Sequence, residues 1–571
     1  MSYVVTQPCC NDASCVEVCP VDCIRPTPGD PEYRTTEMLY IDPQTCIDCG
    51  ACKDACPVDA IYYEDELPEK YQQYAQINAE YFQRHPLESE GLPFVPLSSV
   101  KVPRDEVPLR VAIVGSGPAG AYAAGDLLTR GPNGAVEVEM FDRLPTPWGL
   151  VRAGVAPDHF GTKEVTDVFR KASTKPAFRF HLNVEVGQHL THEELLEYHH
   201  AVIYAVGALR DRKLGVPGED IPGSYAATEF VAWYNGHPDY ADRAFDLSAE
   251  RAVVVGNGNV ALDVARILVS DPDELARTDI AEHALKALQK SNIREVVVLG
   301  RRGPAQAAYT SPELIALGRI PGVDVVVDPL ELDLDSTSRA AVQGIDGPFS
   351  MHLKTQVAEE YSRRSPNPSH KRIVLRYLTS PTRILGSDRV EGVELVHNEL
   401  YQGEDGTLKA RTTDRIETLE AGLVLRSIGY RGTAVPGVPF DDDRGIIPNV
   451  DGRVIDPRTG QPIPGVYTTG WVKRGPSGVI GTNKKCAQDT VKVLFADMAS
   501  GRLSKPKPGH DREALAALVT TRQPRVVDLR GWQAIDAAEK TQGREQRRPR
   551  VKFTDVEAML DVAHDAMHPA T

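Results

Sequence analysis

The stretch that decides the fold of most of this chain is Val111-Ala112-Ile113-Val114-Gly115-Ser116-Gly117-Pro118-Ala119-Gly120. Its apolar half indicates a buried parallel strand, and a helical pattern at 121–128 follows its glycines. The glycines permit a tight turn and let the backbone approach a pyrophosphate at the helix N-terminus. A second strand, at 136–141, ends at Asp142, whose carboxylate suits ribose hydroxyls. The pattern predicts a Rossmann-like, dinucleotide-binding α/β domain.

The same arrangement occurs again at Ala252-Val253-Val254-Val255-Gly256-Asn257-Gly258-Asn259-Val260-Ala261, with the permitted alanine in the last position. A helical insertion at 273–290 precedes the next strand, at 295–299. That strand ends at Arg301 and Arg302 and has no acidic residue at its end. Two guanidinium groups there suit a 2′-phosphate, so we expect NADP rather than NAD, although a solvated arginine pair is the alternative.

Nine of the ten cysteines lie before residue 57, and seven of these nine belong to two related runs. The run Cys46-x-x-Cys49-x-x-Cys52-x-x-x-Cys56-Pro57 has the spacing that holds cubane iron–sulfur clusters. Three thiolates of such a run bind one cluster, and the fourth cysteine reaches a second cluster. The internal repeat Cys9-x-x-Asp12-x-x-Cys15-x-x-x-Cys19-Pro20 has Asp12 in place of the middle cysteine. Zinc or disulfides are the alternatives, but neither needs this run twice.

Exchange of the fourth ligands between the two runs predicts two ligand sets. One set is Cys19, Cys46, Cys49 and Cys52, for a [4Fe-4S] cluster. The other set is Cys9, Cys15 and Cys56, with the Asp12 carboxylate as its fourth candidate. Because iron held by sulfide prefers thiolate ligands, we expect a [3Fe-4S] cluster there, or a [4Fe-4S] cluster that easily loses one iron. We interpret Cys10 and Cys23 as buried small hydrophobic residues, although Cys10 could compete with Cys9.

Residues 1–66 closely resemble the seven-iron bacterial ferredoxins. The matching segments are Val4-Val5-Thr6, Cys15-Val16-Glu17-Val18-Cys19-Pro20-Val21-Asp22-Cys23, Tyr40-Ile41-Asp42-Pro43 and Ile47-Asp48-Cys49. The resemblance implies an α+β ferredoxin-like module that carries one [3Fe-4S] and one [4Fe-4S] cluster and moves single electrons. Residues 25–36 form an insertion between the two cysteine runs.

Residues 108–500 resemble the adrenodoxin-reductase-like ferredoxin–NADP reductases, and the whole chain resembles the mycobacterial-type fusion of such a reductase with a seven-iron ferredoxin. The matching stretches include Leu144-Pro145-Thr146-Pro147-Trp148-Gly149-Leu150-Val151-Arg152 and Gly470-Trp471-Val472-Lys473-Arg474-Gly475-Pro476-Ser477-Gly478-Val479-Ile480-Gly481-Thr482-Asn483-Lys484. One difference is Asp142, where the family usually has Glu, but the shorter carboxylate can still reach a ribose.

This second resemblance implies an α/β two-domain, three-layer Rossmann-like flavoprotein that binds FAD and NADP(H). It places the following residues at the flavin: Trp148, Leu150, Trp471, Gly478, Val479 and Ile480. Gly478 and Glu313 would also contact NADP. His159 and Glu313 would lie near the site of hydride transfer, where we expect them to position the reactants.

The expected organisation has six parts. In chain order they are a ferredoxin with two clusters at 1–66, a helix and proline-rich linker at 67–107, the first part of a FAD domain at 108–210, an NADP domain at 211–421, the second part of the FAD domain at 422–500, and a helical extension at 501–571. Apolar spacing predicts a helix over 71–82 and another over 556–567. A basic run at 544–552 is either a solvated surface or a dock for the acidic ferredoxin.

Composition excludes several classes of protein. The chain has 571 residues, 41% hydrophobic and 25% charged, which is typical of globular proteins. No apolar run reaches about 18 residues, and the N-terminus has no secretory signal, so we expect a cytoplasmic protein without a membrane span. The net charge of −16, with −10 of it in residues 1–66, disfavours nucleic acid as a partner.

These observations together predict a ferredoxin–NADP(+) reductase, a flavin-dependent enzyme. NADPH delivers a hydride, clusters take single electrons, and a flavin can convert between the two. We expect an external one-electron acceptor protein, such as a ferredoxin or a cytochrome P450, and a monomer is compatible with this scheme. One alternative is an electron-input subunit of a larger complex, as in glutamate synthase small subunits, and another is a redox sensor. Disulfide reduction is disfavoured because no cysteine pair follows Cys56.

Overall fold

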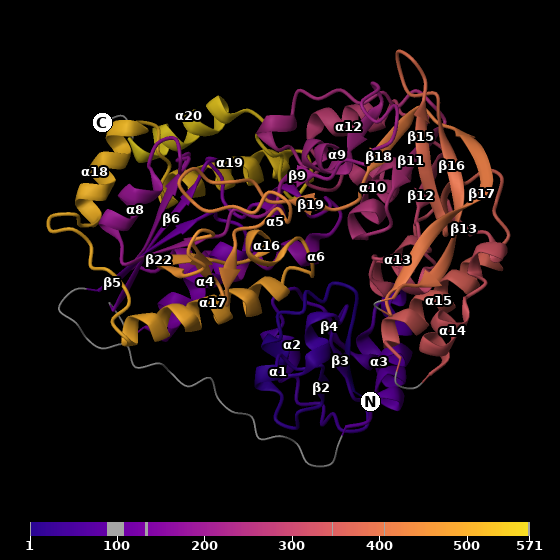
Figure 1. The fold of residues 1–571 in the computed structure, drawn as a ribbon, viewed down its shortest axis with the longest axis horizontal. Helices are drawn as coiled ribbons and strands as arrows, with labels where there is room; N and C mark the ends of the chain where they lie inside the picture. The colour runs from indigo at the N-terminus through magenta and orange to yellow at the C-terminus, as the bar shows by residue number, and fades with distance from the viewer. Residues whose placement is uncertain (1, 88–107, 132–134, 345–346, 405, 569–571) are drawn as a thin grey trace.

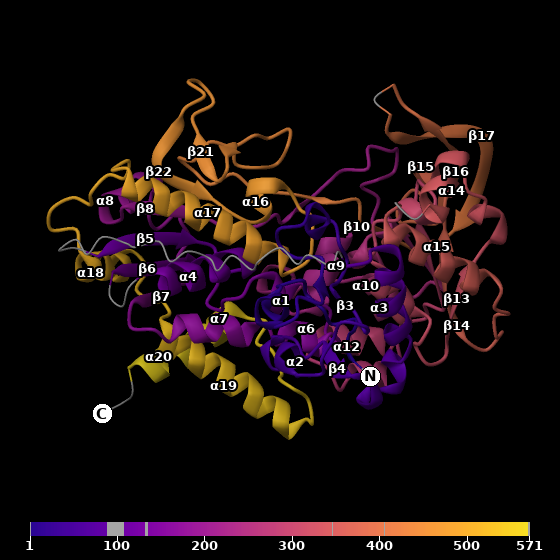
Figure 2. The same cartoon turned by 90° about the horizontal axis from the view of Figure 1, so that it is seen from below.

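The computed structural model describes residues 2–87, 108–131, 135–344, 347–404 and 406–568. The proline-rich tether predicted at 86–108 falls almost wholly outside these residues. Figure 1 shows two α/β domains side by side, with the N-terminal module lying between them and against both. Figure 2, the view from below, shows the same relationship. No helix within the described ranges is long and apolar enough to cross a membrane.

The N-terminal module, residues 2–87, consists of two similar halves, as the internal repeat predicts. Its elements are β1 (Tyr3–Val5), α1 (Ser14–Val18), β2 (Ile24–Arg25), η1 (Pro31–Arg34), β3 (Tyr40–Ile41), α2 (Ala51–Ala55), β4 (Ile61–Tyr63), η2 (Glu64–Glu66), η3 (Glu69–Tyr71) and α3 (Gln73–Arg84). β1 pairs antiparallel with β4, and β2 pairs antiparallel with β3. In each half a short helix leads directly into a Cys-Pro pair.

The helix predicted over 71–82 is present as α3, but it belongs to the module and not to a linker. The Asn78 side chain is 1% exposed and bridges two strands. Its oxygen accepts a hydrogen bond from the backbone of Ile41 at 2.9 Å, and its nitrogen donates to the Val5 carbonyl at 3.0 Å. Because this buried amide hydrogen-bonds to backbone groups of two strands, it fixes α3 on the core of the module. The boundary expected after residue 66 is therefore wrong.

The first α/β domain contains the Rossmann-like sheet that the fingerprint at 111–120 predicts. The strand order is β20-β21-β22-β8-β5-β6-β7, and β22, β8, β5, β6 and β7 are parallel. The strands are β5 (Leu109–Val114), β6 (Val136–Asp142), β7 (Phe178–Leu182), β8 (Ala201–Tyr204), β20 (Asn449–Val450), β21 (Arg453–Ile455) and β22 (Pro462–Thr468). The helices are α4 (Pro118–Arg130), α5 (Leu150–Ala153), α6 (Phe160–Lys163), α7 (Thr166–Ser173), α8 (His192–Tyr198), α16 (Trp471–Arg474) and α17 (Thr482–Ala499).

The second α/β domain follows the fingerprint at 252–261. Its parallel sheet has the order β10-β18-β11-β12-β14-β13, namely β10 (Ser224–Ala226), β18 (Leu423–Arg426), β11 (Arg251–Val255), β12 (Glu295–Leu299), β14 (Lys371–Arg376) and β13 (Val323–Val327). An antiparallel sheet adds β15 (Thr379–Leu385), β16 (Gly392–Gln402) and β17 (Leu408–Glu420). The helices are α9 (Ala227–Tyr234), α10 (Asn259–Val269), α11 (Pro272–Leu275), α12 (Glu282–Leu288), α13 (Ser311–Leu317), α14 (Ser336–Gln343) and α15 (Phe349–Ser362). The helical insertion predicted at 273–290 corresponds to α11 and α12.

The structure corrects the expected return to the FAD domain at residue 422. β18 pairs in parallel with β11 and β10, so it is an inner strand of the second domain's sheet. The crossing between the domains lies just beyond it, where β19 (Tyr430–Arg431) pairs antiparallel with β9 (Arg210–Asp211). We therefore place the first domain at 108–210 and from about residue 430 to residue 500.

The C-terminal extension is helical, as expected, and comprises α18 (Arg512–Arg522), α19 (Leu529–Glu545) and α20 (Val556–Met567). The basic run before α20 divides into two parts: Arg544 and Arg547 are exposed to solvent, whereas its other members are at least partly buried. Arg548 is 6% exposed and donates to the Thr278 carbonyl at 3.0 Å. Lys552 is equally buried and lies 3.1 Å from an oxygen of Asp279. The inner part of the run thus ties the extension to the second domain.

Candidate electron-transfer centre

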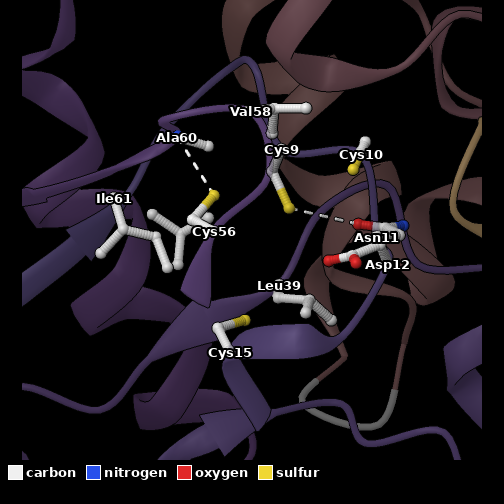
Figure 3. Close-up of a pocket in the computed structure, with 11 residues that line it drawn as sticks. Cys9, Cys10, Asn11, Asp12, Cys15, Leu39, Cys56, Val58, Ala60 and Ile61 are labelled. Atoms are coloured by element: carbon white, nitrogen blue, oxygen red, sulfur yellow. Dashed lines mark hydrogen bonds between the residues drawn. The ribbon is translucent and has the colours of Figure 1, made fainter. Parts of the chain in front are cut away.

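The first cysteine pocket collects side chains from both halves of the repeat. Cys9, Cys15 and Cys56 surround one space, with the Asp12 carboxylate beside them, and apolar residues such as Leu39 and Ile61 complete the lining (Figure 3). Burial raises the pKa of the Cys9 thiol to about 12. Thiolates in such surroundings need positive charge, which the irons of a cluster supply. The donor set therefore fits an iron–sulfur cluster with three thiolate ligands.

The second pocket collects the other predicted set, namely Cys19, Cys46, Cys49 and Cys52. Cys23 also lines it, with its sulfur 3.5 Å from the sulfur of Cys19. Cys10 lines the first pocket in the same way. Both spare cysteines are buried, since Cys23 is 2% exposed and Cys10 is 4% exposed. Their burial agrees with the interpretation as small hydrophobic residues, but each lies beside a predicted ligand set.

The two pockets differ in what surrounds them. The backbone N–H of Gly481 donates to the carbonyl of Cys10 at 2.7 Å, so the first pocket lies against the first α/β domain. Lys484, in the first turn of α17, reaches Asp12 at 3.2 Å. By contrast, Cys49 and Ile47 beside the second pocket are exposed, Ile47 by 58%. One pocket therefore faces the first α/β domain and the other faces solvent.

The module also contacts the second domain. Glu37 accepts a hydrogen bond from the backbone of Ser311 at 2.7 Å and pairs with Lys354 at 2.5 Å. Gln7 donates to Glu313 at 3.4 Å. Ser311 and Glu313 both belong to the first turn of α13. The module thus bridges the two domains through polar contacts that are partly buried.

The first fingerprint has the backbone geometry that a bound pyrophosphate needs. Gly115 has a φ of +103°, and a Cβ there would lie 2.5 Å from the Ala205 carbonyl. A Cβ on Gly120 would lie 2.1 Å from the Gly115 carbonyl, so this glycine allows the helix to pack on the strand. At Gly117 an added Cβ would meet only Gly149, at 4.0 Å, which leaves space in front of the helix N-terminus. The three positions fit the roles of a dinucleotide-binding turn.

Asp142 and Trp148 hold this turn in place through hydrogen bonds to the backbone of Ser116. The backbone N–H of Ser116 donates to the Asp142 carboxylate at 2.9 Å. The backbone N–H of Trp148 donates to the Ser116 carbonyl at 3.2 Å, while its ring packs between Phe169 and Phe180 and is 6% exposed. Leu150 follows directly as the first residue of α5. Sequence reasoning missed that Ser116 engages the same carboxylate that we expect to hold the ribose.

The segment predicted to lie by the isoalloxazine forms one connected loop. The Trp471 ring stacks parallel to Tyr430, with centroids 5.8 Å apart, and its Nε1 donates to the Ser477 carbonyl at 3.2 Å. Gly478 has a φ of +77°, a left-handed conformation that favours glycine. Val479 and Ile480 lead from it into α17. The same loop ends at Gly481, so it extends from the predicted flavin position to the first cysteine pocket.

The second fingerprint differs in that its turn is bonded to a remote segment, through the backbone of Asn257 and the side chain of Asn259. A Cβ on Gly256 would lie 2.1 Å from the Ser427 carbonyl, whereas one on Gly258 would meet nothing within 4 Å. The Asn257 carbonyl accepts from the backbone of Tyr309 at 2.8 Å, and the Asn259 side chain accepts from Thr310 at 2.7 Å. These bonds attach the turn, which continues through Val260 into α10, to the segment that precedes α13. The space at Gly258 is open to a phosphate.

Arg301 and Arg302 follow β12 directly, at the carboxyl edge of the sheet. Arg301 is exposed, and its carbonyl accepts from the Asn398 side chain at 3.0 Å. Burial, and then the charge of Arg301, lower the pKa of Arg302. Among the described residues neither guanidinium has a carboxylate partner. Two adjacent unpaired cations at this edge suit an anionic group such as a phosphate.

His159 and Glu313 come together from different domains, 3.8 Å apart. Asp263 of α10 lies beside them. One imidazole nitrogen of His159 and one carboxylate oxygen each of Asp263 and Glu313 all lie within 4.8 Å of one another. Arg266 bonds to Asp263 and to Asp158, which precedes His159. Sequence reasoning missed Asp263 and Arg266 because no motif marks them, and it missed Gln7 and Lys484 because their partners are remote in the sequence.

Comparisons with known proteins agree with this organisation. Residues 39–62 match the 4Fe-4S binding domain family, and residues 109–297 match the pyridine nucleotide-disulphide oxidoreductase family. The chain is 51% identical, over 99% of its length and 98% of the relative, to a probable ferredoxin/ferredoxin--NADP reductase of Mycobacterium leprae. It is 49% identical to the NADPH-ferredoxin reductase FprA of Mycobacterium tuberculosis, over 80% of this chain and 99% of the relative. The solved structure of Mycobacterium tuberculosis FprA in complex with NADPH matches with a TM-score of 0.75 and 48% identity, over 80% of this chain and 99% of that chain.

Proposed function

The chain belongs to the ferredoxin/ferredoxin–NADP reductase family, and we propose that its two cysteine pockets work in a fixed order, with the Asp12 pocket as the entrance for electrons and the Cys49 pocket as their exit. The protein is a flavin-dependent NADPH–ferredoxin oxidoreductase that binds FAD, NADP(H) and iron–sulfur clusters. When bound, FAD takes a hydride from NADPH and releases single electrons. The proposal concerns the route that this chain provides for those electrons.

The observation that carries this order is the hydrogen bond from the Gly481 N–H to the Cys10 carbonyl, 2.7 Å long. Gly481 ends the loop that begins at Trp471, and Cys10 lies beside the ligand Cys9. A covalent and hydrogen-bonded path therefore connects the flavin side of the loop with the first pocket. The contact is close, because a Cβ on Gly481 would lie 2.2 Å from the Cys10 carbonyl.

The nucleotide sites follow from the two turns. We assign FAD to the turn at 115–120, to Asp142 and to the loop from Trp471 to Gly481, which we call the flavin loop. Trp148 and Leu150 hold the turn, and Gly478, Val479 and Ile480 of the flavin loop cover the ring. We assign NADP to the turn at 256–260, with Arg301 and Arg302 on the 2′-phosphate. His159 and Glu313 position the reacting groups between the domains. The open space at Gly258 supports this assignment, as do the two guanidinium groups, which lack a carboxylate partner within the described ranges.

The cluster types follow from the donor sets. Four thiols at the second pocket suit a [4Fe-4S] cluster, and three thiols with one carboxylate at the first pocket suit a [3Fe-4S] cluster. Oxygen is a weak substitute for thiolate on iron held by sulfide, so the position beside Asp12 is the one without iron.

The exit surface is formed by the exposed residues around the second pocket. Val18 and Ile47, 42% and 58% exposed, are apolar residues next to the ligands Cys19 and Cys46. Glu17 and Asp48 beside them are exposed acids. An apolar centre with an acidic rim fits a one-electron acceptor protein whose docking surface is basic, such as a cytochrome P450 with a basic face.

Two cysteine variants of the full chain test the order. Cys15→Ser removes a ligand at the entrance and Cys49→Ser removes one at the exit. Each variant is reduced anaerobically with NADPH and, in parallel, with dithionite, and the clusters are followed by EPR. We expect Cys49→Ser to keep a first cluster that NADPH reduces, and Cys15→Ser to keep a second cluster that dithionite reduces but NADPH reduces slowly. Rapid NADPH reduction of the second cluster in Cys15→Ser would show that the entrance is elsewhere.

A further inference from the structure

We infer that Lys484, a residue of the reductase part, keeps the first cluster in its three-iron form by holding the Asp12 carboxylate away from the fourth iron position. The inference rests on the proposed function in one respect, because it needs a cluster in the first pocket. It goes beyond that function by assigning control of the iron content to a residue outside the ferredoxin module. Lys484 is here a positioning residue that acts through Asp12.

The geometry uses both oxygens of the carboxylate. Oδ2 accepts hydrogen bonds from Lys484 Nζ at 3.2 Å and from the Ser14 hydroxyl at 2.5 Å. Oδ1 accepts from the backbone N–H of Ser14 at 3.1 Å. Lys484 also donates to the Ser14 hydroxyl at 2.9 Å, so Lys484, Ser14 and Asp12 are each hydrogen-bonded to the other two. Three of the about four acceptor positions of the carboxylate are therefore in use, two of them on Oδ2, which weakens its competition for a metal ion.

The position of Lys484 is set independently of this ion pair. Gly481, three residues earlier, is fixed to the Cys10 carbonyl, and no larger residue fits there. The loop that carries Asp12 and the first turn of α17 are therefore held together by backbone contacts. Lys484 is 20% exposed and Asp12 is 8% exposed, so water screens their attraction only partly.

The charge of Lys484 is unfavourable for its own helix. A cation in the first turn of a helix opposes the helix dipole. Lys484 and Lys485 both lie in the first turn of α17, and Lys485 has its own partner, Asp489, at 2.7 Å. Lys484 is directed instead to Asp12, across 472 residues of sequence. This arrangement is explained if the lysine acts on the carboxylate rather than on the helix.

The chemical consequence concerns uptake of a fourth iron. One electron, which NADPH supplies through the enzyme's own activity, converts [3Fe-4S]⁺ to [3Fe-4S]⁰. Addition of Fe²⁺ to that state gives [4Fe-4S]²⁺ without further electrons, and it forms new bonds to three sulfides and one to a protein ligand. In the native chain Lys484 and Ser14 compete with iron for Asp12, so the last bond does not form. Removal of the lysine charge leaves only the neutral Ser14 hydroxyl on Oδ2, so one acceptor position of that oxygen becomes available for the bond.

The test compares full-length variants in the presence of excess Fe²⁺ and reductant. Lys484→Met removes the charge at similar volume, Lys484→Arg keeps the charge, and Lys484→Met with Asp12→Ala also removes the ligand. After reoxidation and removal of free iron, the three-iron EPR signal and the iron per flavin are measured. We expect wild type and Lys484→Arg to keep the signal at about seven irons. Lys484→Met should lose most of the signal and approach about eight irons, and the double variant should regain it.

The outcomes separate the inference from the function on which it rests. If Lys484→Met keeps the full three-iron signal while Asp12→Cys takes up a fourth iron, the lysine does not control Asp12 and the inference fails. If the double variant loses the signal as well, another ligand is responsible and the inference also fails. In both cases NADPH still reduces the clusters and the proposed order stands. A wild type with no three-iron signal overturns the assignment of the cluster itself. Flavin absorbance and the unfolding temperature verify that each variant is folded.

Discussion

Glu313 joins three parts of the molecule through its two oxygens. One oxygen lies 3.8 Å from His159 of the first domain, and the other accepts a hydrogen bond from Gln7 of the ferredoxin module at 3.4 Å. Glu313 itself belongs to the second domain. The position at which we expect hydride transfer is therefore in contact with the module that receives the electrons, so the docked module restrains the geometry of that position.

The first prediction concerns Glu313→Gln. The substitution removes the charge that faces His159 but keeps the shape of the side chain, so the reactants should be held less well. Loss of correct positioning at a reacting centre costs roughly tenfold or more in rate. We expect the rate of flavin reduction by NADPH in stopped-flow experiments to fall about tenfold, while dithionite still reduces both clusters.

The control for this prediction is Glu404→Gln, which changes an exposed glutamate of the second domain far from both pockets in the sequence. It should leave the rate unchanged. A Glu313→Gln variant that reduces flavin as fast as wild type would show that this carboxylate has no positioning role.

The second prediction concerns the choice between NADPH and NADH. Arg301→Ala with Arg302→Ala removes from the edge of the sheet two guanidinium groups that have no carboxylate partner in the described part of the chain. A hydrogen bond to a charged group contributes about 1.5–3 kcal/mol, so the preference for NADPH should fall at least about tenfold. The ratio of kcat/KM for the two cofactors measures this. Arg363→Ala, on the exposed end of α15, is the matched control. Equal losses with both cofactors would contradict the assignment.

The two fingerprints could be predicted because each strand, glycine turn and helix is consecutive in the sequence. The cysteine sets could be grouped for a similar reason, since the spacing of each run and its repeat are local patterns. The return of the chain to the first domain could not be located, because β18 and the strands of that domain are equally apolar. What distinguishes β18 is its pairing with β11, a partner remote in the sequence.

Charged residues were the least predictable for a related reason. The basic run at 544–552 indicates only that cations are present. Whether Lys552 faces water or a carboxylate depends on Asp279, which the fold brings to it. The same holds for Lys484, whose charge gives no sign of a partner in the ferredoxin module. Sequence patterns record the periodicity of burial, whereas a single ion pair between remote segments leaves no periodic signal.

The third prediction concerns Asp279, which holds Lys163 of the first domain at 2.7 Å and Lys552 of the extension at 3.1 Å. Burial opposes its ionisation, but the two lysine charges outweigh burial and lower the pKa of Asp279 to about 2. In the unfolded chain the pKa of this aspartate is about 3.9. At pH values between the folded and the unfolded pKa, the unfolded chain therefore binds more protons than the folded chain. The stabilisation is therefore complete above about pH 5 and is lost as the pH falls toward 2.

Asp279→Asn should accordingly lower the free energy of unfolding by about 3 kcal/mol at pH 7, because it leaves two buried lysines without their shared anion. Chemical denaturation of wild type and variant at several pH values measures this, and the difference should narrow as the pH falls below about 4. Glu274→Gln, an exposed neighbour, should change little. A difference that stays constant down to pH 2 would contradict the ion-pair explanation.

The fourth prediction concerns Gly481→Ala. The added Cβ would lie 2.2 Å from the Cys10 carbonyl, so the module must move away from the flavin loop. Flavin reduction by NADPH should stay near the wild-type rate, whereas the subsequent reduction of the clusters should slow. Gly125→Ala is the control, since its Cβ would make an ordinary 3.9 Å contact with Ala172. Unchanged cluster reduction in Gly481→Ala would mean that the contact is not on the electron route.

The last prediction concerns removal of the ferredoxin module. Deletion of residues 1–100 removes both cysteine pockets but leaves both nucleotide turns whole, so NADPH should still reduce small artificial acceptors that meet the flavin directly. Reduction of a one-electron protein acceptor should fall sharply. Addition of the separate module at micromolar concentration should restore part of the rate, because a linked module has an effective concentration in the millimolar range.

High salt should suppress that rescue, since the contacts include the pairs Lys484–Asp12 and Lys354–Glu37. In the intact chain the same pairs are partly buried and the module is tethered, so the rate should depend less on salt. If the truncated protein reduces protein acceptors as fast as the full chain, the clusters are not on the electron path. The order of the two pockets and the role of Lys484 would then both lose their basis, although the assignment of the nucleotide sites would remain.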